Sequence, residues 1–447
     1  MSAESLVAAE CLKKQVRHRM SDDDWGIDIN LLRLQGLHTF AVQIPRDSDR
    51  NSGWIELDEM LPFLVLAPNL KHLLLQRNLT YQFPITMLKQ EWHNFAVATK
   101  PVPISSLQSI SIGQLGPHED ILLRLANIMD LSQLRSLQID QTFDTAVLAR
   151  VAALFPNLER LFISTNGRGW RCPDLSTDDN IGIAAIRAFN PLKYLYIRGL
   201  RSVSSLNQIM QRHGPSLKGL IIIPCTRRNG RTGELDSGYK YPELDAFDIS
   251  QLAKSCPQLE ELRLPIKRSM GSQEECEMYK AVGNFSNLYS LVLDLHFDHR
   301  PRPVYRIQVA ETSVLQEVFV NAAMDEKLAL QIWHLISSNQ ASCRLRNLRV
   351  VPFGLEHLPN DEERLLDWFA RSFLITRYNF QNMGVPTVRE IGKSEREIRH
   401  QSLYQAPDGR CIPERLAQVL SDVWPSEPGE NGWESGRSSF PLQSNDA

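Results

Sequence analysis

Apolar and polar residues alternate along this chain in a short pattern that recurs many times. Two strings, PNLKHLLLQRN and PNLERLFISTN, have apolar residues at the spacing L-x-x-L-x-L and an Asn three positions later, at Leu70, Leu73, Leu75 and Asn78 and at Leu158, Leu161, Ile163 and Asn166. Nine looser copies begin at Leu37, Leu107, Leu134, Leu192, Leu217, Leu259, Leu288, Leu315 and Leu345. The last two apolar residues of a copy are two positions apart, so both point to one face of a short β-strand. The pattern therefore predicts eleven strands.

Helical patterns fill most of the intervals between these strands. They cover residues 57–67, 119–131, 145–155, 203–212, 249–255 and 326–337. In the third of them, Val147, Val151 and Leu154 follow helical spacing. Several end at a Pro just before the next strand, as in FPNL, GPSL and CPQL, which favours a helix stop. One strand and one helix, repeated, predict a right-handed stack with a parallel sheet inside and helices outside.

This arrangement resembles the leucine-rich-repeat family in its longer strand–helix form, over roughly residues 30–375. The resemblance implies an α/β solenoid, a horseshoe of about eleven strand–helix repeats. The alternative is a (β/α) barrel enzyme, which also alternates strands and helices. Eleven units are too many for eight barrel strands, and barrel strands rarely share one L-x-L signature, so the solenoid is favoured.

The solenoid sets the predicted domain organisation. Residues 1–30 are an N-terminal cap or remnant, 31–376 the repeat solenoid, 377–404 a C-terminal cap or linker, and 405–447 a mostly disordered tail rich in Pro, Gly, Ser and acids. Within the tail, residues 413–423 fit one short helix. Trp424 and Trp433 are either a docking motif or side chains that fold back onto the last repeat.

Composition narrows the class of protein further. The chain has 447 residues, 43% of them apolar, and 49 Lys+Arg against 52 Asp+Glu give a net charge of −3. This balance argues against a dedicated nucleic-acid or polybasic membrane surface. Seven Cys without C-x-x-C make neither a disulfide framework nor a zinc module. There is no secretory signal pattern and no apolar run of about 18–20 residues, so we expect a cytoplasmic or nuclear protein.

Candidate chemistry along the chain is sparse. The best metal-like cluster, Asp294-Leu-His296-Phe-Asp298-His299, follows a predicted strand and is better explained as a polar loop. Two Gly/Arg segments, 166–170 and 227–233, lack the spacings of phosphate-binding loops, and the second fits an insertion in the longest repeat. Neither G-x-S-x-G nor H-E-x-x-H occurs. We therefore predict no catalytic, cofactor-binding or metal-binding residues and no enzymatic activity.

The outward positions of the strands supply a candidate binding surface. Aromatic, arginine and isoleucine side chains gather there in the middle of the predicted concave sheet: Arg160, Phe162, Tyr194, Tyr196, Arg198, Ile221, Ile223 and Arg263. Aromatic and Arg residues are enriched in interface hot spots. The sequence thus predicts a protein partner on this face, with no nucleic acid and no membrane. The alternative is that a neighbouring loop, residues 226–247, covers the apolar members.

The strings FPNLERL and CPQLEEL also resemble those of fungal F-box/leucine-rich-repeat proteins. The resemblance implies a substrate receptor of an SCF-type ubiquitin ligase, in which an F-box helix bundle binds a Skp adaptor and cullin. The opening MSAESLVAAECLKKQVRHRMSDDDW does not have the Leu-Pro start of an F-box. Residues 358–368 imitate that start, but their place after the last repeat favours a capping helix. Two functions stay open: a ubiquitin-ligase receptor, and an interaction scaffold or regulator without an F-box and without a ubiquitin role.

Overall fold

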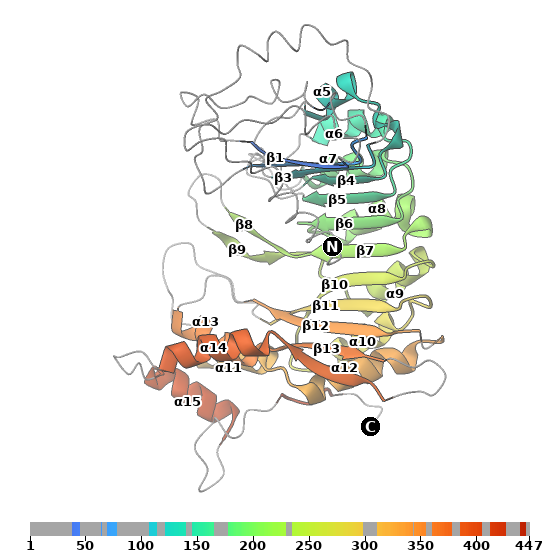
Figure 1. Ribbon diagram of the computed structural model, residues 1–447. Helices are drawn as coiled ribbons and strands as arrows, with labels where there is room; N and C mark the ends of the chain where they lie inside the picture. The colour runs from blue at the N-terminus through green and yellow to red at the C-terminus, as the bar shows by residue number, and fades with distance from the viewer. Residues whose placement is uncertain are drawn as a thin grey trace, which may run out of the picture. The chain divides into compact units, whose positions relative to one another are not determined.

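The computed structural model describes the chain in separate stretches, which Figure 1 shows as coloured ribbon. They are residues 38–44, 64, 69–77, 107–113, 121–139, 145–164, 178–228, 235–297, 311–342, 344–354, 360–377, 385–404, 412–425 and 439–443. The chain divides into two compact units, Met1–Gly169 with Ala184–Asn190, and Trp170–Ile183 with Pro191–Ala447. Each unit has a solenoid-like α/β organisation and is described by itself.

The first unit contains a parallel sheet whose strands pair in chain order. Its strands are β1 (Thr39–Ile44), β2 (His72–Arg77), β3 (Ser109–Gly113), β4 (Ser136–Ile139) and β5 (Arg160–Ser164). The register aligns equivalent apolar residues, so that Leu73 pairs with Ile110 and Leu137 pairs with Leu161. These four side chains are buried. Helices α5 (Ile121–Ile128) and α6 (Thr145–Val151) belong to the same unit, and α7 (Asp178–Ala188) runs across the division between the units.

The second unit has a longer sheet that changes direction near its end. Strands β6 (Tyr194–Arg198), β7 (Gly219–Ile223), β10 (Glu261–Lys267), β11 (Ser290–His296) and β12 (Asn347–Phe353) are parallel. Strands β13 (Ser372–Thr376) and β14 (Thr387–Ile391) continue the sheet in antiparallel pairing. Between β7 and β10 the chain forms a two-stranded antiparallel pair, β8 (Cys225–Arg228) and β9 (Leu235–Lys240).

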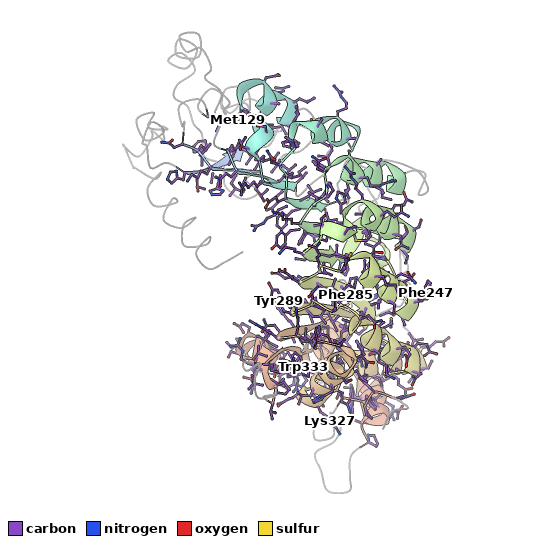
Figure 2. All side chains as sticks on the ribbon, turned by 90° about the vertical axis from the view of Figure 1, so that its right-hand side faces the viewer. Met129, Phe247, Phe285, Tyr289, Lys327 and Trp333 are labelled. Carbon is purple, nitrogen blue, oxygen red and sulfur yellow. The ribbon has the colours of Figure 1, made fainter. Side chains whose placement is uncertain are left out.

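Four helices of the second unit pack in sequence against one another: α8 (Val203–His213), α9 (Ala246–Ser255), α10 (Gln273–Val282) and α12 (Glu326–Asn339). Figure 2 shows α9 with Phe247 on one side of the sheet and Tyr289 on the opposite side. A further group consists of α11 (Thr312–Ala322), α13 (Asn360–Phe369), α14 (Lys393–Tyr404) and α15 (Glu414–Val423) (Figure 1). Among the described residues, no helix combines the length and the apolar character that crossing a bilayer requires.

A regular hydrogen-bond ladder joins successive repeats at the starts of eight parallel strands: β2, β3, β4, β5, β7, β10, β11 and β12. One backbone carbonyl accepts two consecutive N–H groups from the next repeat, as Lys218 O does from Glu260 and Glu261 and Glu260 O does from Tyr289 and Ser290. An Asn just before the leading Leu of a repeat adds a side-chain bond: Asn287 Nδ2 donates to the Pro257 carbonyl at 2.8 Å. Equivalent bonds occur in the first unit, so the stacking geometry recurs from repeat to repeat.

The strand predictions are confirmed at ten of the eleven positions and wrong at one. The copy that begins at Leu315 is not a strand, because α11 spans it. Leu315, Val318, Phe319 and Ala322 have i, i+3, i+4, i+7 spacing and are all buried in one apolar cluster. Consequently Asn321, which a strand beginning at this copy would point outward, is a buried helix residue.

The helix predictions agree with α5, α6, α8, α9 and α12, while residues 57–67 lie outside the described residues except for Leu64. The capping helix predicted after the last repeat corresponds to α13, and the short helix predicted in the tail to α15. Trp424 folds back, because its ring stacks on Phe369 with centroids 4.8 Å apart. Trp433 lies outside the described residues. Strands β13 and β14 were not predicted, and the predicted domain boundaries stay predictions.

Candidate functional site

The open face of the second unit's sheet carries most of the predicted binding residues. Along each strand, buried leucines and isoleucines alternate with outward side chains, as in β6, where Leu195 and Ile197 are buried. The outward side chains of Tyr194 and Tyr196 are half-buried and Arg198 is exposed. Ile221, Ile223 and Arg263 hold equivalent outward positions on β7 and β10 and are also half-buried. The structure therefore places these six predicted residues on one face.

The remaining two predicted residues lie in the first unit. Arg160 and Phe162 occupy outward positions of β5, opposite Ser136 and Gln138 of β4 in the register. Arg160 is exposed and Phe162 is half-buried. The predicted set of eight thus divides into a group of two and a group of six, one in each unit.

Strand pairing aligns the six-residue group in rows across the sheet. Tyr196 pairs with Ile221, and Ile221 pairs with Arg263. In the next row, Tyr194 lies opposite Gly219, and a Cβ atom built on Gly219 would come within 2.6 Å of Tyr194 Cδ1. A side chain at residue 219 would displace the tyrosine ring, so the Gly allows Tyr194 to lie flat on the neighbouring strand.

Arg263 forms the main ion pair on this face. Its Nε and Nη2 atoms donate to the two carboxylate oxygens of Asp294 at 2.7 and 2.9 Å, a bidentate geometry. Burial raises the pKa of Asp294, and the hydrogen bonds from Arg263 and the charges of Arg263 and Arg349 oppose that effect. Asp294 was predicted to lie in a polar loop. It lies in β11 instead, where its carboxylate pairs with an arginine of the neighbouring strand β10.

His296, the second member of the predicted loop, is also a buried strand residue. Its ring stacks on Phe353 with centroids 4.8 Å apart, and its Nδ1 atom is 2.9 Å from the Tyr241 hydroxyl. Burial raises the pKa of Tyr241 above its ordinary value. Asp298 and His299 lie outside the described residues, within which no group of three or more His, Cys, Asp or Glu side chains is placed to hold a metal ion.

Two arginines on this face were not among the predicted binding residues. Arg349 pairs with Leu374, and Leu374 pairs with Arg389, so both arginines share the row that contains Arg263. Arg349 and Arg389 are exposed. The L-x-x-L-x-V copy placed Arg349 at an outward position, but β14 carries no repeat pattern. Only antiparallel pairing brings Arg389 to this face.

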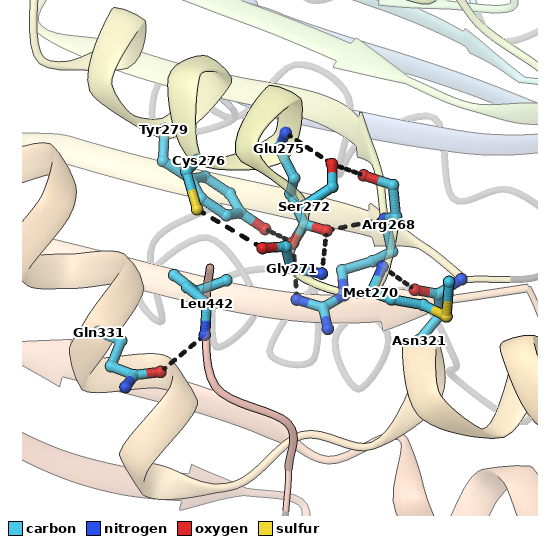
Figure 3. Close-up of polar contacts among 11 residues, drawn as sticks. Arg268, Met270, Gly271, Ser272, Glu275, Cys276, Tyr279, Asn321, Gln331 and Leu442 are labelled. Atoms are coloured by element: carbon cyan, nitrogen blue, oxygen red, sulfur yellow. Dashed lines mark hydrogen bonds and ion pairs between the residues drawn. The ribbon is translucent and has the colours of Figure 1, made fainter. Parts of the chain in front are cut away.

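A buried polar network lies in the same unit, apart from this row (Figure 3). Glu275 accepts hydrogen bonds from Arg268 Nη1 and the Tyr279 hydroxyl, both at 2.7 Å, and from the backbone N–H groups of Ser269 at 2.7 Å and Gly271 at 3.0 Å. The side chains of Arg268 and Glu275 are 1% and 0% exposed. Such a pair fixes the loop that enters α10 and has no access to a solvent-borne ligand.

That loop is also the contact point for the C-terminal residues 439–443. The Gln443 N–H donates to the Gly271 carbonyl at 2.8 Å. The Leu442 N–H donates to Gln331 Oε1 at 3.4 Å (Figure 3). At its other end the segment reaches the N-cap residue of α12, Asp325, whose Oδ1 accepts from the Ser439 hydroxyl at 2.6 Å. A segment far along the chain therefore stabilises the loop between β10 and α10.

Comparison of the sequence with models of known protein families finds no match, and comparison with curated proteins finds no significant match either.

Proposed function

We propose that this chain is a leucine-rich-repeat solenoid that binds a partner protein on the open face of its sheet. The observation that carries the proposal is the row of half-buried side chains Tyr196, Ile221 and Arg263, aligned by strand pairing on the face opposite α9. Aromatic and arginine side chains bury a large area with little loss of conformational freedom, which is why they dominate interface hot spots.

The leucine-rich-repeat assignment has its own support. The hydrogen-bond ladder repeats at the starts of eight parallel strands, and an Asn just before the leading Leu bonds to the preceding repeat in both units. Stacked repeats that bury apolar strand residues beneath helices leave the opposite strand face free for recognition. The proposed class of activity is therefore binding, without catalysis.

A narrower version of the proposal is a substrate receptor of an SCF-type ubiquitin ligase, supported by the FPNLERL and CPQLEEL strings. The segment 358–368 gives it no support, because α13 buries Leu365, Leu366 and Phe369 inside the apolar cluster of the second unit. An F-box helix needs a free apolar face for its adaptor. We therefore place the ubiquitin-ligase role second, behind a recognition module without that role.

The test is affinity capture with the tagged full chain, compared with two variants. In the first, Tyr194→Ala and Tyr196→Ala remove the aromatic part of the open face. In the second, Phe247→Ala removes an apolar side chain of α9 that is 68% exposed on the opposite side. A partner that binds the wild type and the Phe247 variant, and is lost from the tyrosine variant, supports the proposal. Equal recovery by all three would contradict it.

The same captures decide the narrower version. A ubiquitin-ligase receptor co-purifies with a Skp adaptor and cullin, and because these bind outside the open face, both are retained by the tyrosine variant. Recovery of the partner without adaptor or cullin removes the ubiquitin-ligase role and leaves the recognition function intact.

A further inference from the structure

Arginine alternates with apolar residues along one row of the open face in the second unit. The register joins, strand by strand, the seven residues of this row: Tyr196, Ile221, Arg263, Val292, Arg349, Leu374 and Arg389. Directly paired residues have their side chains on the same side of a sheet. We call this row, from β6 to β14, the arginine stripe.

The charges of the stripe are not equally available to a partner. Arg263 is held by both carboxylate oxygens of Asp294. Glu261, in the neighbouring row, accepts a hydrogen bond from the Tyr289 hydroxyl at 2.8 Å. Arg349 and Arg389 are both exposed, with half-buried Leu374 between them. The stripe therefore offers two positive charges separated by an apolar contact.

The spacing of these charges selects a conformation for the ligand. Adjacent strands are about 4.8 Å apart, so residues on alternate strands are separated by roughly 10 Å. A polyproline II chain has three residues per turn and rises about 3.1 Å per residue, so every third side chain faces the same way at a spacing of about 9 Å. In a β-strand, same-side residues two apart are separated by about 6.7 Å, which fits the stripe less well.

We propose that the arginine stripe binds an acidic segment of the partner protein in a polyproline II conformation, with Asp or Glu at every third position. Two consecutive carboxylates contact Arg349 and Arg389, and the residues between them contact Leu374. The inference rests on the proposed recognition function and specifies the chemistry of the partner. A polyanion such as single-stranded nucleic acid fits less well, because it carries a negative charge on every nucleotide, and a charge between those held by Arg349 and Arg389 would face the apolar Leu374.

The test measures binding of fluorescent peptides to the full chain by anisotropy at about 50 mM and about 200 mM salt. One peptide repeats Glu-Pro-Ala five times, and a second has the same composition with its five Glu residues contiguous. A third probe is an oligonucleotide of the same net charge. Two double variants lose the same charge: Arg349→Gln with Arg389→Gln on the stripe, and Arg212→Gln with Lys254→Gln on exposed surface of α8 and α9.

The proposal predicts that the periodic peptide binds at least threefold more tightly than the contiguous one and weakens at the higher salt concentration. The stripe variant lowers its affinity about tenfold, and the helix-surface variant changes it less than twofold. If both variants lose the same affinity for the periodic peptide, the binding depends only on the net charge of the protein, and the proposal is overturned. So would tighter, stripe-dependent binding of the oligonucleotide, or no difference between the peptides.

Failure of the acidic-segment proposal can be distinguished from failure of the proposed recognition function. If the captured partner is lost from the tyrosine variant and retained by the stripe variant, recognition on the open face stands and the acidic-segment inference fails. If the peptides bind in a stripe-dependent manner and the tyrosine variant still captures its partner, the acidic site stands and the tyrosine patch is not the recognition surface. Circular dichroism confirms folding of each variant, which the exposed positions of Arg349 and Arg389 favour.

Discussion

Glu275→Gln should destabilise the second unit more than any other isosteric change on α10. The carboxylate is fully buried and accepts four hydrogen bonds, two at each oxygen. The amide replaces one oxygen by an NH₂ group, so whichever way it is oriented two of the four donors lose the oxygen that accepts from them. The counter-charge of Arg268 is lost as well.

The magnitude follows from the burial of both partners. Removing one member of a buried ion pair costs about 3–5 kcal/mol, because the remaining charge stays out of water. Glu275 is also the charge that, with Tyr279, raises the pKa of Arg268 against the opposing effect of burial. We expect the free energy of unfolding of the second unit to fall by about 3–5 kcal/mol, measured by urea unfolding followed by circular dichroism.

Glu277→Gln is the matched control, two residues further along the same helix. Its carboxylate accepts from Gln273 Nε2 at 2.6 Å and from Lys280 Nζ at 3.2 Å, and its side chain is 45% exposed. An exposed pair contributes about 0.2–1 kcal/mol, so this variant should lose less than about 1 kcal/mol. If the two variants unfold at the same urea concentration, the buried network is not a main source of stability.

A second measurement separates this local effect from general loosening. The network orders the loop at Gly271, whose carbonyl accepts from the Gln443 N–H. Hydrogen exchange at Gln443 should accelerate in Glu275→Gln and stay unchanged in Glu277→Gln. Unchanged exchange in both would show that the C-terminal segment does not depend on the network.

Three further perturbations probe packing and titration. Trp424→Ala removes a buried ring that stacks on Phe369 and should cost about 3–5 kcal/mol in urea unfolding; a loss below about 1 kcal/mol would contradict the packing of α15. Gly283→Ala places a Cβ within 2.8 Å of both a backbone oxygen and a Cβ of α12, so we expect a loss of about 1–3 kcal/mol, and an unchanged melting temperature would refute the close approach. Burial raises the pKa of Tyr241 and of Tyr279 above 10, so between about pH 10 and 12 the unfolded chain loses protons that the folded chain keeps. Stability should therefore fall as pH rises, by about 1.4 kcal/mol per pH unit for each tyrosine, and a urea midpoint constant from pH 9 to 11 would contradict this.

Local spacing predicted most strands and their faces, because the L-x-x-L-x-L geometry is set within six residues. In β7 the run Leu220, Ile221, Ile222 and Ile223 is apolar throughout, and alternation alone cannot orient it. The leading Leu217 of the repeat pattern indicates which residues face the core, and Leu220 and Ile222 are indeed the buried pair. The outward positions of Ile221 and Ile223 could therefore be predicted from the sequence.

The same spacing wrongly predicted a strand at Leu315, because the interval of three residues between its first two apolar positions also fits a helix. An apolar residue three positions after another is compatible with both the turn into a strand and one turn of a helix. Phe319 and Ala322 complete a helical stripe there, and the cluster with α13 and α15 stabilises it. Packing against distant segments decides between strand and helix here, and the spacing of apolar residues within one segment carries no information about that packing.

The arginine stripe shows which residues of the open face can be predicted from local patterns. Arg349 stands in a repeat and could be placed outward from its spacing. Arg389 reaches the same row only because β13 reverses the chain direction and β14 pairs with it, a choice that depends on contacts between distant segments. The part of the face's positive charge that Arg389 supplies is therefore a product of the sheet's end.

The fate of Asp294 and His296 explains why the apparent metal-like cluster has another role. Strands β10, β11 and β12 have seven residues each, against five in β6 and β7, so the two polar residues continue a strand instead of entering a loop. Buried there, each needs a partner from outside its own segment, which Arg263 supplies for Asp294 and Tyr241 for His296. Polar groups engaged in this way hold the strands together and are withdrawn from ligand chemistry. Arg349 and Arg389 are instead exposed on this face, which is the physical reason to test these two residues first.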